Sequence, residues 1–411
     1  MSSVGQLFLI ATFSFCGSYF LFKRRSVDFL TLYFSSLVLF SLPLFFSSAY
    51  LVGARRYVYP EIETYASYGL AFLGCVFIAL FSDGVKNKAR FSSEVVKITS
   101  DNRVYFYYCF FSLFFSLAVL SLIFSGIGEA RNKSQALDNV GVEYMVMGSL
   151  LVSGYLVSLL SEQKAFSVIF LLLAVGVFLI GSRSPLVFII LGRFFSVSKS
   201  TQVVLVKKAG WLLVAVSGLV FVVLGKSLYG YMYSGLGFSA WFSDFNSDYF
   251  VVGSEFLRTN GILNSVVVSN YQIPWWSVFV SFLKILPFPE GFYSVDISYF
   301  SNNFQNDVFP WVDYGIAFNP LAEAYAWAGL WGVAFYALFI PMMLSTLWRL
   351  YLNSGGPLFK AILILAGVTV AFWVHRNTLG STFGYIRNAV YPSLVIYFLA
   401  FSCATILRGG R

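Results

Sequence analysis

The feature that most constrains the fold of this chain is a series of apolar blocks, most of them about 17 to 25 residues long, the length that crosses a bilayer core as a helix. Only 11% of the 411 residues are charged, whereas a soluble protein carries about a quarter. The blocks do not alternate apolar with polar residues, which argues against an outer-membrane β-barrel. We therefore expect an all-α polytopic membrane protein.

The apolar blocks divide the chain into three parts. Residues 1–225 hold eight expected spans, 226–319 form one long interruption, and 320–411 hold three further spans. The expected spans are 5–22, 28–51, 64–82, 104–126, 143–160, 165–181, 184–197, 209–225, 320–347, 358–374 and 388–407.

The charges of the connecting segments predict the orientation. One set of alternate connections holds 17 of the 27 Lys and Arg residues but only five of the 18 acidic residues. Because Lys and Arg collect on the cytoplasmic side, we expect this face inside and the 226–319 loop outside. The net charge of +9 then reflects topology, and no nucleic-acid partner is expected.

The long loop contains a short apolar helix and many aromatic residues. Prolines bound the segment that begins with Trp275 and Trp276, which is too short to span and is expected to lie in the membrane interface. Further along lie Trp311 and Tyr314, which together with Tyr325 could stack on sugar rings. Anchoring in the interface explains any single one of these aromatic residues equally well.

Four arginines on the expected outer face contradict the usual charge rule. Arg183 sits in a tight Gly-Ser-Arg-Ser-Pro turn, Arg376 and Arg387 bound the last outer loop, and Arg258 lies in the long loop. A guanidinium group offers two-pronged hydrogen bonding to phosphate, so these residues predict an anionic substrate. The alternative is a surface arginine that extends to the aqueous phase, and a loop of this length would carry some exposed arginine such as Arg258 in any case.

Two further residues could take part in proton transfer. His375 is the only histidine and could act as a general base or, when protonated, bind an anion; it could equally be a hydrogen-bonded structural residue. Glu323 lies in the first turn after Pro320, where the helix dipole favours a carboxylate. It could accept a proton from a sugar hydroxyl or orient an arginine.

The sequence indicates neither a metal site nor a cofactor. The four cysteines all fall inside apolar blocks, and no Cys or His spacing matches a metal site. No clustered carboxylates suggest a required metal, so we expect metal-independent chemistry.

Around these residues the chain resembles the O-antigen polymerase family, often called Wzy. The resemblance rests on Gly315, Phe318 to Pro320, Ala322 to Tyr325, Gly329 and Gly332, and on the Gly181-Ser182-Arg183 turn before a long outer loop. Each motif is short, and their order and spacing carry the match. Some members have an arginine followed after ten residues by glycine; here Arg258 is followed at that distance by Ser269, so no role is transferred to Arg258 from that motif.

The resemblance implies a multi-pass glycosyltransferase of the bacterial inner membrane with a GT-C-like helical fold and an active site facing the periplasm. Such an enzyme polymerises undecaprenyl-pyrophosphate-linked oligosaccharide repeat units during lipopolysaccharide biosynthesis, in contact with membrane lipid and with a protein that regulates chain length. Cations aimed at the pyrophosphate would stabilise the leaving group. The candidates are Arg183, Arg376 and Arg387, with Arg258 in second place, and the candidate bases are Glu323 and His375.

Two other functions share these features. An O-antigen ligase, which transfers finished glycan to lipid A-core, has a similar loop, but members of that family place a histidine in it and residues 226–318 contain none. A flippase for lipid-linked sugars usually has repeated halves, and no internal repeat is found. Both observations favour the polymerase.

Overall fold

The computed structural model describes residues 2–24, 27–46, 49–51, 56–84, 100–124, 142–179, 184–197, 235, 237–243, 255–287, 299–310 and 317–409. The described part is a bundle of helices with one short β-hairpin. Five of its helices are long and apolar enough to cross a membrane, and five shorter apolar helices accompany them. The prediction of a helical membrane protein is supported to this extent. The expected span 209–225 lies outside the described residues.

The N-terminal part of the bundle contains the first seven expected spans. In order, its elements are α1 (Ser2–Ser18), the π-helix η1 (Tyr19–Arg24), α2 (Phe29–Phe45), β1 (Ala49–Leu51), β2 (Arg56–Val58), α3 (Ile62–Gly84), α4 (Ser100–Phe124), α6 (Val142–Leu160), α7 (Lys164–Leu179) and α8 (Ser184–Val197).

The C-terminal part begins with short helices and ends with three long ones. In order, its elements are α10 (Gly237–Ser243), α12 (Glu255–Ser269), α13 (Trp275–Leu283), α14 (Tyr299–Val308), α15 (Pro320–Asn353), α16 (Pro357–Phe372), the 3₁₀ helix η4 (Trp373–Arg376) and α17 (Leu379–Gly409). The short apolar helix expected between prolines is α13, with Pro274 at its N-cap.

Two expected boundaries were wrong. The helix expected over 28–51 ends at Phe45, just after Pro43, and the chain then forms β1, which pairs antiparallel with β2. The helix expected over 388–407 begins at Leu379. At the start of α17 the Leu379 N–H binds the distant Glu323 side chain, a contact that hydropathy does not report.

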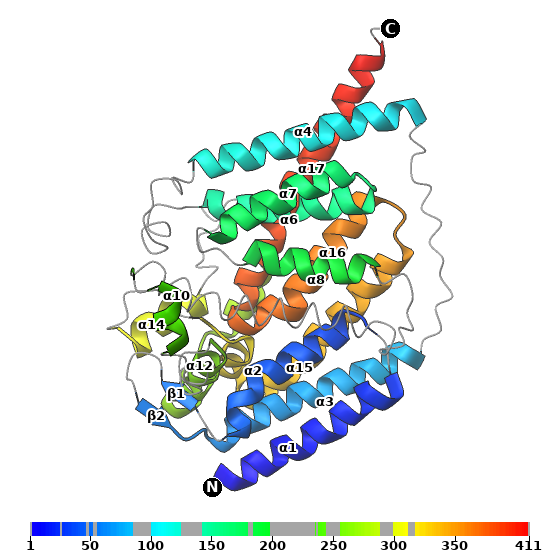
Figure 1. Cartoon of the computed structure of the whole chain (residues 1–411). Coiled ribbons are helices and arrows are strands. Elements are labelled where there is room, and N and C mark those ends of the chain that lie inside the picture. The colour runs from blue at the N-terminus through cyan, green and yellow to red at the C-terminus, as the bar shows by residue number, and fades with distance from the viewer. Residues whose placement is uncertain are drawn as a thin grey trace.

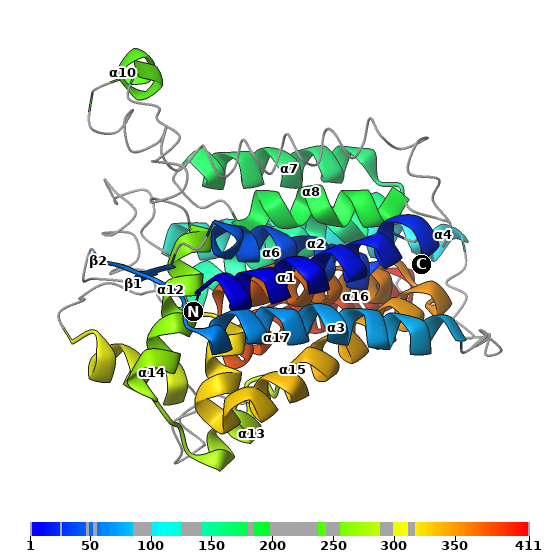
Figure 2. The same ribbon diagram turned by 90° about the horizontal axis from the view of Figure 1, so that it is seen from below.

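The elements of the long loop gather at one end of the bundle. In Figure 1 the hairpin, α10, α12 and α14 all lie at the left-hand end of the bundle, and Figure 2 shows α10 well separated from α12 and α14. Helix α12 packs on β1 and on the ends of α2, α3 and α15. The Asn264 side chain of α12 accepts hydrogen bonds from the backbone of Glu61 (2.9 Å) and the hydroxyl of Thr64 (3.0 Å). The loop after α2 and the long loop therefore lie on the same side of the bundle, as the alternation of spans predicts.

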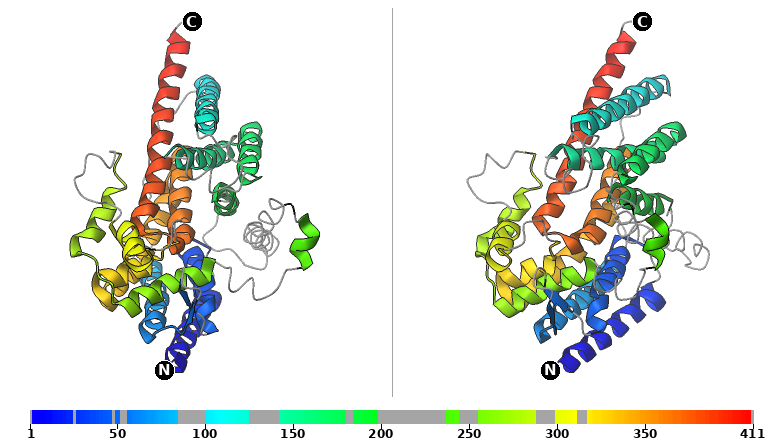
Figure 3. Two further views of the ribbon diagram at one scale, coloured as in Figure 1. Left: turned by 90° about the vertical axis from the view of Figure 1, so that its left-hand side faces the viewer. Right: turned by 60° about the vertical axis from the view of Figure 1, so that its left-hand side comes forward.

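Helices α3 and α15 pack closely because a glycine lies between them. A Cβ atom added to Gly74 would overlap the carbonyl oxygen of Ala337. Figure 2 shows α15 running beside α3, with α13 next to the start of α15. Helix α17 runs beside α16 and crosses α4; in Figure 3 it rises past α4 toward the C-terminus, and it packs on α4, α6 and α16.

Helix α15 is broken near its start. Ala328 (φ −152°, ψ 30°) and Gly329 (φ 58°, ψ −143°) have non-helical backbone angles, and this conformation at Gly329 is one that only glycine adopts readily. The Ala326 carbonyl accepts a hydrogen bond from the Ile273 N–H, 3.0 Å away. The break therefore sets residues 320–327 apart as a short helical segment to which the chain before α13 is attached.

Candidate functional site

The strongest candidate for a site is centred on residues 317–323, where the long loop enters α15. The backbone N–H of Phe318 donates to the carbonyl oxygen of Arg376 over 3.0 Å. Five residues along, the Glu323 side chain accepts the backbone N–H of Leu379 over 2.8 Å. These two bonds hold the entry to α15 alongside the turn between α16 and α17, so two separate parts of the sequence form one local structure.

Asn319 fixes the start of α15. Its Oδ1 accepts the Leu321 N–H over 2.9 Å, which is the usual N-cap bond, and Pro320 follows at the first helical position, where its missing N–H is harmless. Its Nδ2 donates to the Tyr68 hydroxyl (3.0 Å) and to the Thr259 carbonyl (3.2 Å). One buried amide thus joins α15 to α3 and α12.

Glu323 is almost completely buried, with 2% of its surface exposed. Besides the bond from Leu379, its Oε1 accepts a long bond of 3.4 Å from the Ser281 hydroxyl of α13. Its carboxylate lies at the start of α17. The helix dipole favours negative charge there, and so does the Leu379 N–H, which has no acceptor within its own helix. Of the roles predicted for Glu323, this geometry favours orienting the segment that carries Arg376, because a 2% exposed carboxylate is closed to a sugar hydroxyl.

His375 is held between two aromatic rings. Its ring stacks on Tyr33, with centroids 4.8 Å apart, and on Phe40 at 5.2 Å. The side chain is buried, and its Nε2 has no hydrogen-bond partner among the described residues. The imidazole also hydrogen-bonds to the backbone of Tyr33 and Ala371, so the structure places His375 as a structural residue of η4, directly before Arg376.

Arg376 is half-buried and carries its charge at the edge of the site. Its guanidinium carbon lies 4.5 Å from the centre of the Trp373 ring, a cation–π contact that restricts its direction. The backbone of Arg376 is fixed by Phe318, as described above. Of the predicted pyrophosphate ligands, Arg376 is the one whose own backbone is bonded to the entry of α15, and its side chain remains partly accessible.

Arg258 lies close by on α12, and Arg387 does not belong to the same cluster. Arg258 is half-buried and directly precedes Thr259, which Asn319 binds. Arg387 was expected to close the last outer loop, and this was wrong, because residues 379–409 form one helix. Arg387 lies about 12 Å along α17 from Leu379, where its Nε donates to Asn388 over 3.3 Å.

Of the three aromatic residues expected to stack on sugar rings, the structure describes Tyr325. Tyr325 is half-buried in the short segment of α15, two residues after Glu323, and interacts electrostatically with Glu63 of α3. Arg183, Trp311 and Tyr314 lie outside the described residues.

Two site residues were missed by the sequence analysis: Ser281 of α13 and Lys284, which directly follows that helix. Ser281 binds Glu323, and the Lys284 charge acts on the same carboxyl group. Ser277, Ser281 and Lys284 follow one another at intervals of four and three residues. This spacing places them on one face of an otherwise apolar helix. A polar stripe on a helix expected at the membrane interface was the signal that could have found them.

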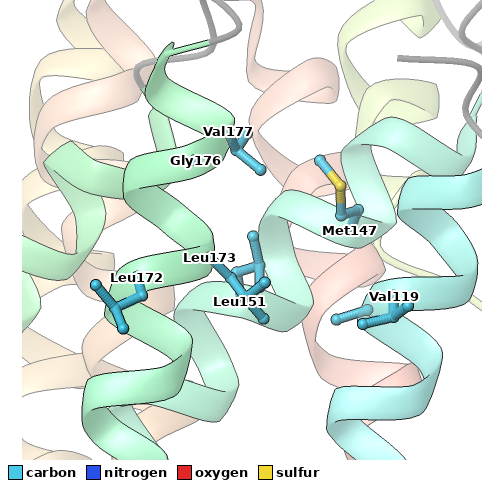
Figure 4. A pocket seen from close by; sticks show the side chains of 8 residues that line it. Val119, Met147, Leu151, Leu172, Leu173, Gly176 and Val177 are labelled. Atoms are coloured by element: carbon cyan, nitrogen blue, oxygen red, sulfur yellow. The ribbon is translucent and has the colours of Figure 1, made fainter. Parts of the chain in front are cut away.

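A pocket among the described residues lies away from this site and is lined by apolar residues. It is a crevice of about 170 Å³ between α4, α6 and α7, lined by Ala118, Val119, Met147, Leu151, Leu172, Leu173, Gly176 and Val177. Figure 4 shows these apolar side chains facing one another across the crevice. Among the described residues, no three His, Cys, Asp or Glu side chains are grouped so that they could hold a metal ion.

Comparison with models of protein families, with curated proteins and with solved structures gives no match for this chain. Inference about function therefore depends on the residues at the entry to α15 and on the sequence motifs that surround them.

Proposed function

We propose that this protein is a membrane glycosyltransferase that polymerises polyprenyl-pyrophosphate-linked repeat units, as O-antigen polymerases do. The observation that carries the proposal is the bonding of residues 318–323 to Arg376, Leu379 and α12. These bonds bring the buried Glu323 carboxylate together with η4, which carries Arg376, and α12, which carries Arg258. All three lie at the end of the bundle where the long loop lies.

The reaction would transfer a glycan from its lipid carrier to a second repeat unit. The bond between the anomeric carbon and the pyrophosphate oxygen breaks, and its electron pair goes to that oxygen. A hydroxyl oxygen of the acceptor sugar bonds to the anomeric carbon, and its proton passes to the departing pyrophosphate oxygen, directly or through water. Negative charge grows on the pyrophosphate, so a fixed cation nearby stabilises the transition state more than the ground state. Arg376 takes this role, and Arg258 is the second cation.

Glu323 acts in this proposal by holding the Arg376 turn in place. Its bond to Leu379 fixes the backbone three residues after Arg376, and the Phe318 bond fixes Arg376 itself. A guanidinium whose backbone is fixed on both sides loses little freedom when it binds an anion, which is how preorganised sites gain rate.

The finer topology is part of the same proposal. It comprises eleven spans with a GT-C-like arrangement, a long loop in the periplasm and location in a bacterial inner membrane. The uneven distribution of Lys and Arg between alternate connections supports this orientation, and the gathering of the loop helices at one end agrees with it.

The test is reconstitution of the purified protein in detergent with a polyprenyl-pyrophosphate-linked repeat unit, a metal chelator and no lipid A-core. A ladder of longer lipid-linked glycans is expected. Arg376→Ala should lower the rate by about 10²- to 10³-fold, the effect of losing one charge-stabilising donor. Lys164→Ala, at an exposed position at the start of α7, is the matched control and should leave the ladder unchanged.

Three results would contradict the proposal. A full ladder from Arg376→Ala would remove the assigned role of that arginine. Transfer that occurs only after lipid A-core is added would indicate a ligase. No glycan transfer in either mixture, with movement of lipid-linked sugar between the leaflets of vesicles, would indicate a flippase.

A further inference from the structure

We infer that Lys284 is a positioning residue for Glu323 and that α13 is therefore a part of the site rather than a membrane anchor alone. This inference rests on the proposed function and names a residue to which the sequence motifs assign no role.

The aromatic face of α13 is exposed and its polar face is buried. Trp275 and Phe279 are 73% and 50% exposed, whereas Ser277, Ser281 and Lys284 are all below 10%. The aromatic face suits the membrane interface. The polar face is turned into the protein, which is the reverse of a helix that lies on a soluble core. A buried lysine is rare unless a charged partner is near, so the inward face needs an explanation other than anchoring.

Glu323 is the acid on which the Lys284 charge acts. It is 2% exposed and accepts the Ser281 hydroxyl from the preceding turn of α13. The Lys284 stem lies against Gly380, the residue after Leu379, whose N–H binds Glu323, so the ammonium charge acts on the carboxyl group from nearby. A carboxylate buried in an apolar bundle needs both hydrogen bonds and an opposite charge. Leu379 and Ser281 provide the bonds, and Lys284 provides the charge.

The close packing of α13 on α17 holds Lys284 in this place. A Cβ atom on Gly380 would lie 3.3 Å from Cδ of Lys284 and 3.3 Å from the Ser281 side chain, so the stem of Lys284 passes directly over the start of α17. At its other end α13 is attached to the short segment of α15: Ile273 donates to the Ala326 carbonyl over 3.0 Å, and Trp327 Nε1 donates to the Trp275 carbonyl over 2.9 Å. Movement of α13 would therefore move Lys284 relative to Glu323.

The experiment compares Lys284→Met, Lys284→Arg, Glu323→Gln and the double variant Lys284→Met/Glu323→Gln, with Lys164→Met as the control at an exposed lysine. Thermal unfolding is measured in detergent for each protein. If the two side chains act on each other, the fall in melting temperature for the double variant is smaller than the sum of the two single falls, because substitutions within one network of hydrogen bonds and charges are not additive. Additive falls would overturn the inference whatever the activity.

Polymerisation kinetics give the second measurement. Lys284→Met should lower kcat by about a hundredfold, as expected for a misplaced group, with KM little changed, and Lys284→Arg should restore part of kcat because it keeps the charge. A structural role alone would lower the melting temperature and leave kcat of the folded protein unchanged, and that result would also overturn the inference. If the unaltered protein makes no glycan, the proposed function fails, and the unfolding measurements alone decide whether Lys284 positions Glu323.

Discussion

The backbone N–H of Leu379 donates a hydrogen bond of 2.8 Å to Oε2 of Glu323, so a side chain in the first turn of α15 caps the first turn of α17. The two residues are 56 positions apart in the sequence. Arg376 precedes Leu379 by three residues, and its own carbonyl oxygen accepts a hydrogen bond from the Phe318 N–H. The half-buried Arg376 is thus held by one bond to its own backbone and one to the backbone three residues later.

Removing the Glu323 side chain should separate its capping function from any role in proton transfer. Glu323→Ala leaves the buried Leu379 N–H without an acceptor, which costs about 1–3 kcal/mol, and thermal unfolding in detergent should show this loss. Glu323→Gln keeps an oxygen acceptor and should be destabilised less. An equal loss of stability in the two variants would contradict the capping role. Loss of polymerisation in a well-folded Glu323→Gln protein would show that the negative charge is needed as well.

Replacing His375 should distinguish packing from catalysis. His375→Phe keeps a ring between Tyr33 and Phe40 but loses the hydrogen bonds of the imidazole to the backbone of Tyr33 and Ala371, so its melting temperature should fall, and by less than that of His375→Ala. His375→Ala leaves a cavity and should lose about 3 kcal/mol, as other large buried rings do. We expect the glycan ladder to persist in His375→Phe. Its disappearance from a folded protein would assign a chemical role to His375.

Asn319 should control the attachment of α12. Asn319→Ser keeps an N-cap oxygen but loses the donors to Tyr68 and Thr259, whereas Asn319→Ala loses the cap as well, at a further cost of about 1 kcal/mol. Both variants should show faster tryptic cleavage after Arg258, because α12 is less firmly held. Unchanged cleavage at Arg258 in Asn319→Ser would mean that other contacts are sufficient to hold α12.

The break in α15 should be more sensitive to glycine replacement than a regular helix is. Gly332→Ala would bring a Cβ atom into the carbonyl oxygen of Ala324, whereas a Cβ on Gly176 of α7 meets nothing within 4 Å. Gly332→Ala should therefore lower the melting temperature, and Gly176→Ala should leave it unchanged or raise it by the equivalent of up to about 1 kcal/mol. Similar melting temperatures for the two variants would show that the region of the break can relax.

The sequence by itself determined those features that depend on neighbouring residues. Apolar blocks of membrane-spanning length predicted a helical membrane protein, and five helices of the described residues are long and apolar enough to cross a membrane. Prolines predicted the short helix that became α13, and Pro320 marked the start of α15. Hydropathy, capping and proline geometry act within a few residues, so they can be read along the chain.

Only the tertiary structure decided which polar residues meet. The helical position of Arg387, the stacking of His375, and the place of Lys284 beside Glu323 all depend on packing between segments far apart in the sequence. Glu323 was predicted as a functional carboxylate, but its partner, the N–H of Leu379, is a backbone group that any residue would supply. Residue type therefore gives no information about such a partner, and only the packing of α15, α13 and α17 against one another brings it within reach.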